Sequence, residues 1–341
     1  MVDWRVARRI AAGIAGEDDL PVLPGDLAEL CADAEQRVSA YAQLEVLTPL
    51  PAPEAVSRAG WTEANLSGMR SVLDPIASKI GKGKGPFAPA LRSAGGLLLG
   101  VEVGGMLGLL SQRVLGQYEV PPNDPERPAR LLFVAPNLDD AARKLAVDEE
   151  QMLRWVVLHE VTHAVQFSSV PWLRAHVASM VDELSEALDV KLELRAVLKL
   201  RGDDLREAVQ RLRQDGVMAF ALGPGRKDLL DRVQSTMALI EGHAEHVMDA
   251  AGVEVLPDLE QLRGALERRR RDRPPILRIF EKLMGLEMKM RQYEVGKRFC
   301  DTVVERGGVA ALNRAWESPG SLPTWAEMEQ PDQWLARTAP V

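Results

Sequence analysis

Two histidines and a glutamate in the segment LHEVTHAVQF, residues 158–167, have the spacing of a metal site. His159 and His163 stand four residues apart, so on an α-helix both imidazoles lie on one face and can reach one cation. Glu160 lies near the same cation without having to bind it, and a carboxylate there can take a proton from a zinc-activated water. The segment therefore predicts a zinc site with Glu160 as catalytic base. The competing interpretation is a helix that merely carries two hydrogen-bonded histidines.

A catalytic zinc ion takes three protein ligands and leaves one position for water, so a third ligand must come from elsewhere. The candidates are His176 and four side chains of the segment ALIEGHAEHVMDAAG, namely Glu241, His243, Glu245 and His246. On a helix Glu241 and Glu245 share a face, whereas His243 lies roughly 160° around from Glu241. If Glu241 binds the metal, His243 cannot easily do so, and Glu245 is placed to accept the free N–H of a ligand histidine.

These two segments together resemble the gluzincin pattern of thermolysin-like peptidases, in which an H-E-x-x-H helix is followed by a helix with E-x-x-x-D/E. The resemblance implies that His159, His163 and Glu241 are the metal ligands and that Glu160 is the base. It also implies that Glu245 orients a ligand histidine, most readily His159. Glutamate stands at position 245, where aspartate is commoner in this pattern.

The sequence offers several candidates for the group that would stabilise an oxyanion. Metallopeptidases use a Tyr, His or Arg donor for this purpose. His243, if it is not a ligand, could serve from across the cleft or could form a hydrogen bond in the core. Arg291 and Tyr293 in KMRQYEVGKRF are further candidates, although a tyrosine that packs with its hydroxyl at the surface would give the same pattern.

Longer segments are similar to one family over most of the chain. They are GWTEANLSGMRSVLDPI, VLHEVTHAVQFSSVPWLRAHV, ALIEGHAEHVMDAAG, EMKMRQYEVGKRFCDTVVERGG and RAWESPGSLPTWAEMEQPDQWLAR. Together they resemble the zincin-like hydrolases, some of which are labelled as associated with the biosynthesis of a deazaflavin coenzyme. The resemblance runs from about Trp4 to Arg337 and implies a mainly helical, zincin-like fold. It implies no particular substrate.

The elements that must position these residues are mostly helices. Amphipathic patterns predict helices over residues 26–44, 63–80, 146–166, 174–200, 227–251, 259–271, 276–305 and 325–338. The one clear strand is Leu131–Val134, which QYEVPP could pair with and which we expect to offer an edge to an extended substrate. The fold class is therefore mainly α with a small β element near the active-site helix. We expect a single domain over residues 1–341, with a possible helical half 1–120 and a catalytic half 121–341.

The glycines at positions 96, 100, 104 and 108 recur at every fourth residue of an apolar run. This spacing lets another helix approach closely, and it occurs in paired membrane helices. The run is short for a membrane span and contains Glu102, so a buried helix packed tightly on a neighbour is favoured over stable membrane insertion. Self-association through the stripe is a third possibility, and a homo-oligomer stays possible.

Composition bears on the partners and the localisation of the protein. The net charge of −8 argues against a nucleic-acid partner. The two cysteines have no C-x-x-C spacing, and the first residues have no apolar core of signal-peptide length, so we expect a cytoplasmic protein. The sequence thus predicts a zinc metallopeptidase or related hydrolase that acts on peptide or amide substrates. The alternative is a helical protein that keeps zinc as a structural or binding element, without hydrolysis.

Overall fold

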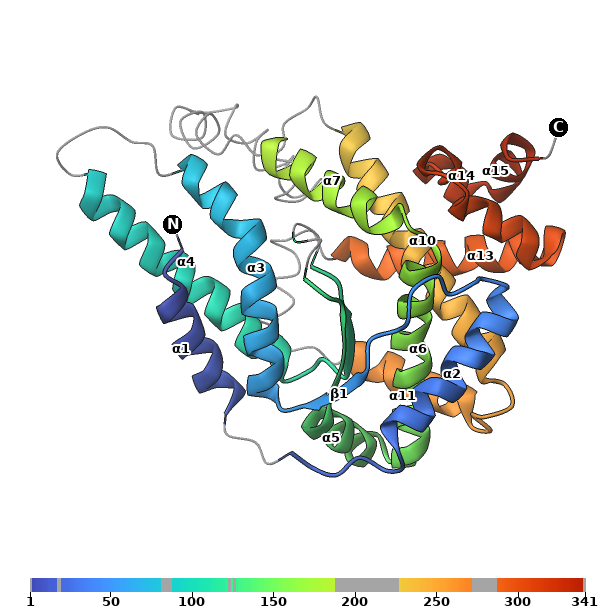
Figure 1. The fold of residues 1–341 in the computed structure, drawn as a ribbon, viewed down its shortest axis with the longest axis horizontal. Helices are drawn as coiled ribbons and strands as arrows, with labels where there is room; N and C mark the ends of the chain where they lie inside the picture. The colour runs from blue at the N-terminus through green and yellow to red at the C-terminus, as the bar shows by residue number, and fades with distance from the viewer. Residues whose placement is uncertain are drawn as a thin grey trace.

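The computed structural model describes residues 2–16, 20–80, 88–121, 124, 127–187, 227–271 and 287–339. Over these residues the fold is mainly helical with one small sheet, which confirms the predicted fold class (Figure 1). The longer helices are α1 (Trp4–Ala15), α2 (Leu27–Ala42), α3 (Arg58–Ile80), α4 (Ala88–Ser111), α5 (Ala135–Leu145), α6 (Glu149–Ser169), α7 (Leu173–Ala187), α10 (Lys227–Gly252), α11 (Leu259–Arg271) and α13 (Glu287–Asn313). Two short helices, α14 (Trp325–Glu329) and α15 (Pro331–Arg337), follow.

The sheet has the strands β1 (Pro53–Val56), β2 (Gly116–Glu119) and β3 (Arg130–Val134) in the order β1-β3-β2. β3 pairs in parallel with β1 and antiparallel with β2, so the predicted pairing of QYEVPP with Leu131–Val134 is confirmed. The prediction that Leu131–Val134 offers a free edge is wrong, because this strand is central. The edge strand next to the metal-site helix is β2, whose Tyr118 backbone N–H donates to Glu160 on α6.

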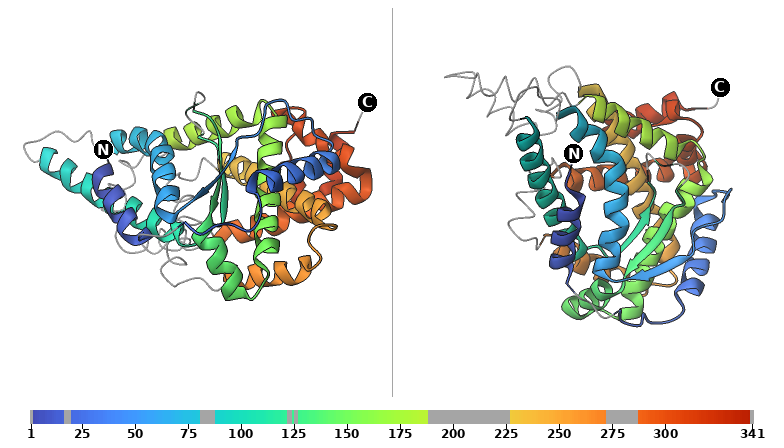
Figure 2. Two further views of the ribbon diagram at one scale, coloured as in Figure 1. Left: turned by 60° about the horizontal axis from the view of Figure 1, so that its bottom comes forward. Right: turned by 60° about the vertical axis from the view of Figure 1, so that its left-hand side comes forward.

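Alternate residues of β3 serve two different cores. Leu131 and Phe133 pack with side chains of α2, α5 and α6, whereas Leu132 and Val134 pack with side chains of α1, α3 and α4. This is the two-residue period of a strand that is buried on both faces. Figures 1 and 2 show the resulting layers, with α1, α3 and α4 on one side of the sheet and α6 and α2 on the other.

The glycine stripe of α4 packs against α1. A Cβ added at Gly104 would collide with the backbone of Ala7, and one at Gly100 would meet the backbone carbonyl of Asp3. This confirms the predicted close packing on a neighbouring helix. The helix is buried on that face only, because Leu97, Leu98 and Val101 of α4 are exposed. Because α1 covers the stripe, the stripe itself cannot mediate self-association. Within the described residues, no helix is long and apolar enough to cross a membrane.

Several predicted helix boundaries differ from those observed. Helices α1 and α5 are not among the predictions, α13 continues beyond residue 305 with a break at Gly308 (φ 73°), and Pro331 divides the predicted C-terminal helix in two. Helix α10 begins where predicted and runs from Lys227 to Gly252. The predicted helical stretches 188–200 and 276–286 lie outside the described residues.

Candidate metal centre

Helix α6 carries both histidines and is buried on almost all sides. Asp148 caps it by accepting a hydrogen bond from the Gln151 backbone N–H, and Glu149 and Glu150 add favourable negative charge in the first turn. One turn before His159, the Trp155 ring stacks parallel to the imidazole with ring centroids 5.9 Å apart. Trp155 therefore lies against the ring of the first histidine.

The two histidines of α6 and Glu241 of α10 lie close together. The rings of His159 and His163 meet edge to face at 4.8 Å, and Glu241 of α10 places Oε2 3.6 Å from Nε2 of His163. One ligand atom from each residue can be chosen so that all three lie within 4.8 Å of one another. Donors about 2.0–2.2 Å from a tetrahedral zinc ion lie roughly 3.4 Å apart, so small side-chain adjustments would close this cluster on a metal.

A glycine contact between α10 and α13 holds Glu241 in position. Gly242, the next residue, faces Gly296, and a Cβ on either glycine would collide with backbone atoms of the opposite helix. Only glycine lets the two backbones approach this closely. The distance between Glu241 and the histidines of α6 therefore depends on the α10–α13 contact, where there is no room for a side chain.

Glu160 lies beside the cluster with a defined orientation. The backbone N–H of Tyr118 donates to Oε2 of Glu160 at 2.8 Å, and Gly116 of the same strand leaves space for the glutamate stem. A Cβ at Gly116 would lie only 2.7 Å from Cγ of Glu160. Burial raises the pKa of Glu160 to about 7, despite the opposing effects of His163 and of the Tyr118 hydrogen bond. A carboxyl group with this pKa can exchange a proton near neutral pH.

His163 responds to the same surroundings in the opposite sense. Burial disfavours its charged form, but the neighbouring Glu241 and Glu160 carboxylates outweigh this, and the pKa of His163 is raised. Two groups with raised pKa values, Glu160 and His163, beside a further carboxyl group are typical of functional sites.

The remaining predicted site residues differ in what the structure shows of them. His243 is 1% exposed and packs edge to face on Trp316 at 5.2 Å, and burial lowers its pKa to about 3. Glu245 lies half-buried one turn after Glu241, and its contact with His159 stays a prediction. Tyr293 lies in α13, but its side chain is outside the described part of the chain.

The two other histidines considered as third ligands have different surroundings. His246 is bound between the Tyr41 hydroxyl, 2.8 Å from Nε2, and the Asp301 carboxylate, 2.7 Å from Nδ1. His176 of α7 packs edge to face on Trp172, the residue before that helix. Neither belongs to the group of described residues that could hold one metal ion.

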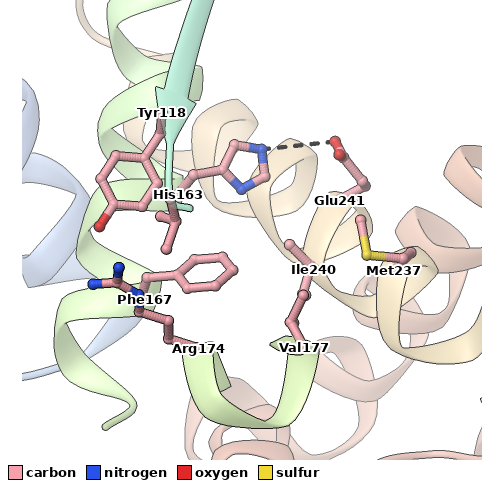
Figure 3. A pocket seen from close by; sticks show the side chains of 9 residues that line it. Tyr118, His163, Phe167, Arg174, Val177, Met237, Ile240 and Glu241 are labelled. Carbon is pink, nitrogen blue, oxygen red and sulfur yellow. Dashed lines mark ion pairs between the residues drawn. The ribbon is translucent and has the colours of Figure 1, made fainter. Parts of the chain in front are cut away.

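A cavity of about 190 Å³ opens beside the cluster (Figure 3). It is lined by Tyr118, Val120, His163, Phe167, Arg174, Val177, Met237, Ile240 and Glu241. The sequence gives no sign of Tyr118 or Arg174 as site residues. Tyr118 reaches the cavity only because β2 pairs on the α6 side of β3, and Arg174 does so only because the chain turns back after α6.

Comparison with known proteins agrees with this architecture. A family model described as zincin-like metallopeptidase matches residues 2–335, and the chain therefore belongs to that family. The crystal structure of a protein described as a "putative hydrolase with a novel fold", from Chloroflexus aurantiacus, is similar with a TM-score of 0.72. The two sequences are 29% identical, and the match covers 100% of each chain. No curated protein matches the chain.

Family membership implies a metal ion, usually zinc, and the described cluster is compatible with one. Two imidazoles and one carboxylate are a known donor set of catalytic zinc sites. Their close approach is itself informative, because a carboxylate and two histidines buried together are costly unless protons or a cation balance the charge. The chain thus belongs to the zinc hydrolases in general terms.

Proposed function

We propose that the protein is a zinc-dependent hydrolase that cleaves peptide or amide bonds, with His159, His163 and Glu241 as metal ligands and Glu160 as base. The observation that carries the proposal is the approach of these three donor side chains to one point, with the raised-pKa carboxyl group of Glu160 next to them. A zinc ion bound there would polarise the substrate carbonyl and make a water molecule acidic enough to lose a proton near neutral pH.

The chain's own groups then move the proton. The Tyr118 N–H holds one oxygen of Glu160, which fixes the plane of the carboxylate and leaves Oε1 to accept a proton from water. The water oxygen joins the carbonyl carbon, the carbon–nitrogen bond breaks, and the proton passes from Glu160 to the leaving amine. A base with a pKa near neutrality suits both halves of this transfer.

An extended substrate would have to lie along β2. Strand addition is a common way to bind peptides, and β2 is the strand at the sheet edge beside α6. The Tyr118 N–H is already given to Glu160, so main-chain pairing with substrate would begin beyond it, at Val120. Val120 and Tyr118 both line the cavity, which supports a substrate at this edge.

The rival function is a zinc protein without hydrolysis, with a closed site of four protein ligands. His243 is the sequence's candidate for the fourth ligand. Among the described residues it is not part of the metal-compatible group, and it packs on Trp316. A group of three donors among the described residues matches the number of protein ligands at catalytic zinc sites, which favours the enzyme.

The experiment compares two glutamates of the same helix. Glu160→Gln should retain about one zinc per chain and reduce turnover of a peptide library by at least about a hundredfold. Glu150→Gln, which removes an exposed carboxylate paired with Arg154 on α6, should retain both zinc and turnover. Retained turnover in Glu160→Gln would remove Glu160 from the mechanism. Bound zinc without turnover of any peptide or amide by the wild type would favour the non-catalytic alternative.

A further inference from the structure

The cavity beside the metal cluster is apolar along most of its wall. Its apolar lining is formed by Val120, Phe167, Val177, Met237 and Ile240. A protein cavity of about 150 Å³ with such a lining is large enough to bind benzene, so about 190 Å³ admits one large apolar side chain. His163 and Glu241 form the part of the wall that belongs to the metal cluster. A side chain bound here would therefore lie next to the reacting groups.

Among the described residues that line the cavity, Arg174 is the only arginine or lysine. In the view of Figure 3, its guanidinium lies beside the rings of Tyr118 and Phe167, across the cavity from Glu241. One terminal nitrogen donates to the backbone carbonyls of Pro121, Asp124 and Arg127, at 3.2, 2.6 and 2.9 Å.

The charge of Arg174 is not neutralised by this arrangement. Its Nε is buried without a hydrogen-bond partner, and its bonds go to neutral carbonyls rather than to an acid. Among the residues that the structure describes, none forms an ion pair with it. Arg174 also stands in the first turn of α7, where the helix dipole disfavours a cation. A half-buried guanidinium in such surroundings is favourable to a carboxylate ligand.

We infer that the cavity binds the C-terminal residue of a peptide, with an apolar side chain in the cavity and the terminal carboxylate on Arg174. The binding site is inferred from the cavity alone, but the cleavage that follows from it rests on the proposed function. With that residue in the cavity, the amide nitrogen before it lies toward His163 and Glu241, so the last peptide bond is the one cleaved. Water supplies OH to the carbonyl carbon and H to the nitrogen, and one apolar amino acid leaves with a free amine.

A purely structural role for Arg174 makes a different prediction. If the guanidinium only anchors the chain between β2 and β3 through three carbonyls, its charge is irrelevant to ligands. Carboxylate and amide ligands would then bind equally well to the wild-type protein. The comparison of two ligands on one unaltered protein therefore separates the two roles before any variant is made.

The test uses N-acetylphenylalanine and N-acetylphenylalaninamide as probes, with binding to the zinc-loaded protein measured by NMR titration. The carboxylate should bind at least about tenfold more tightly, as expected for a charge-assisted contact with arginine. A carboxylate could also bind the metal directly, so the titration is repeated after removal of zinc by a chelator. A preference due to Arg174 persists without zinc, whereas a preference due to the metal disappears.

Two variants and one control sharpen the result. Arg174→Gln should bring the ratio of the two affinities close to one while leaving amide binding unchanged. Val177→Trp should fill the cavity and abolish binding of both probes. Arg232→Gln removes an exposed arginine paired with Glu183 of α7, and it should change neither affinity.

Equal affinity of the wild type for the two probes, or no binding of either, would overturn the inference. So would a preference that vanishes with the metal or that survives Arg174→Gln. Turnover is tested separately on peptides that end in phenylalanine with a free or an amidated C-terminus. Preferential binding without any cleavage would contradict the proposed function and leave the binding site established.

Discussion

Two pairs of helices in this molecule pack through glycine, and they serve different ends. In α1–α4 the glycines at 100, 104 and 108 let α1 lie directly on α4. In α10–α13 one glycine on each helix, Gly242 and Gly296, brings the backbones together. The first pair lies on the side of the sheet away from the histidines, and the second carries Glu241 (Figure 1).

The difference shows where close packing becomes functional. A shift between α1 and α4 alters the hydrophobic core around Trp61, Val103 and Leu107. A shift between α10 and α13 moves the residue next to Gly242, which is the carboxylate that faces His163. The same physical device therefore stabilises the fold in one place and sets the ligand geometry in the other.

The largest effect on stability is expected when a glycine at either helix contact is replaced by alanine. Gly296→Ala and Gly104→Ala each place a methyl group against backbone that cannot rotate away, and each should destabilise the fold by about 1–3 kcal/mol or more. Gly296→Ala should in addition lose zinc, because α10 must move away from α13. Gly104→Ala should keep about one zinc per folded chain. Thermal unfolding and elemental analysis of the two purified variants measure both quantities.

The comparison fails if the two variants behave alike. Zinc retained at full stoichiometry in Gly296→Ala would show that the α10–α13 contact does not set the ligand geometry. Zinc lost from folded Gly104→Ala would show that the α1–α4 pair is coupled to the site.

A smaller effect is expected at the strand that holds Glu160. The methyl group of Gly116→Ala would collide with Cγ of Glu160 and with a side-chain carbon of Val156. Because both contacts are with side chains, these can move aside and the fold is retained. The displaced base should lower kcat by about tenfold to a hundredfold, since a misplacement of about 1 Å can cost this much. Zinc content and the unfolding temperature should change little. An unchanged kcat would mean that the position of Glu160 is not critical.

The pH dependence should follow the ionisation of Glu160. The base acts as a carboxylate, so kcat/KM should rise with pH as Glu160 loses its proton. Burial raises its pKa to about 7 in the absence of metal, and a bound dication would lower it, which places the acid limb at or below pH 7. Gly104→Ala should leave this profile unchanged.

Metal binding should weaken over a similar pH range for a separate reason. A histidine ligand must be neutral, and the raised pKa of His163 means that its proton competes with the metal as the pH falls. Zinc content measured at each pH separates the two effects. Full zinc occupancy throughout the acid limb would assign that limb to Glu160, and a limb that tracks zinc loss would assign it to the ligands.

The smallest effect is predicted for Gly105→Ala on α4. Apart from the helix's own adjoining backbone, no atom of the described residues lies within 4 Å of a Cβ at this position, in contrast to Gly104 beside it. Replacing an unconstrained helical glycine by alanine should be neutral or stabilise the fold by up to about 1 kcal/mol. Destabilisation measured by chemical denaturation would show that this face of α4 is covered by something else.

The sequence predicts features that depend on spacing within one helix, but not those that depend on contacts between distant segments. The spacing of His159 and His163 is a local property of one helix, so the sequence reveals it directly. The α4 stripe is equally local. Gly242 and Gly296 are 54 residues apart by number and have no pattern of their own, so only the packed structure shows that they meet.

The same limit applies around the cavity. Tyr118, Arg174 and Gly116 acquire their positions from the pairing of β2 with β3 and from the turn between α6 and α7. The strand signal at Leu131–Val134 gave the existence of a strand but not its order in the sheet, and the expected free edge was therefore assigned to the wrong strand. Helix α5 is short and begins immediately after β3, so its start merges with the strand signal.

The central claim is that Glu241 completes a metal site with His159 and His163. The most direct test is the zinc content of protein purified without added metal, measured by elemental analysis for the wild type, Glu241→Ala and Glu183→Ala. Glu183 provides a surface control because its carboxylate pairs with Arg232 on exposed side chains. We predict about one zinc per chain in the wild type and in Glu183→Ala, and a loss of zinc in folded Glu241→Ala. Zinc retained in Glu241→Ala, or absent from the wild type even after titration with zinc, would contradict the claim.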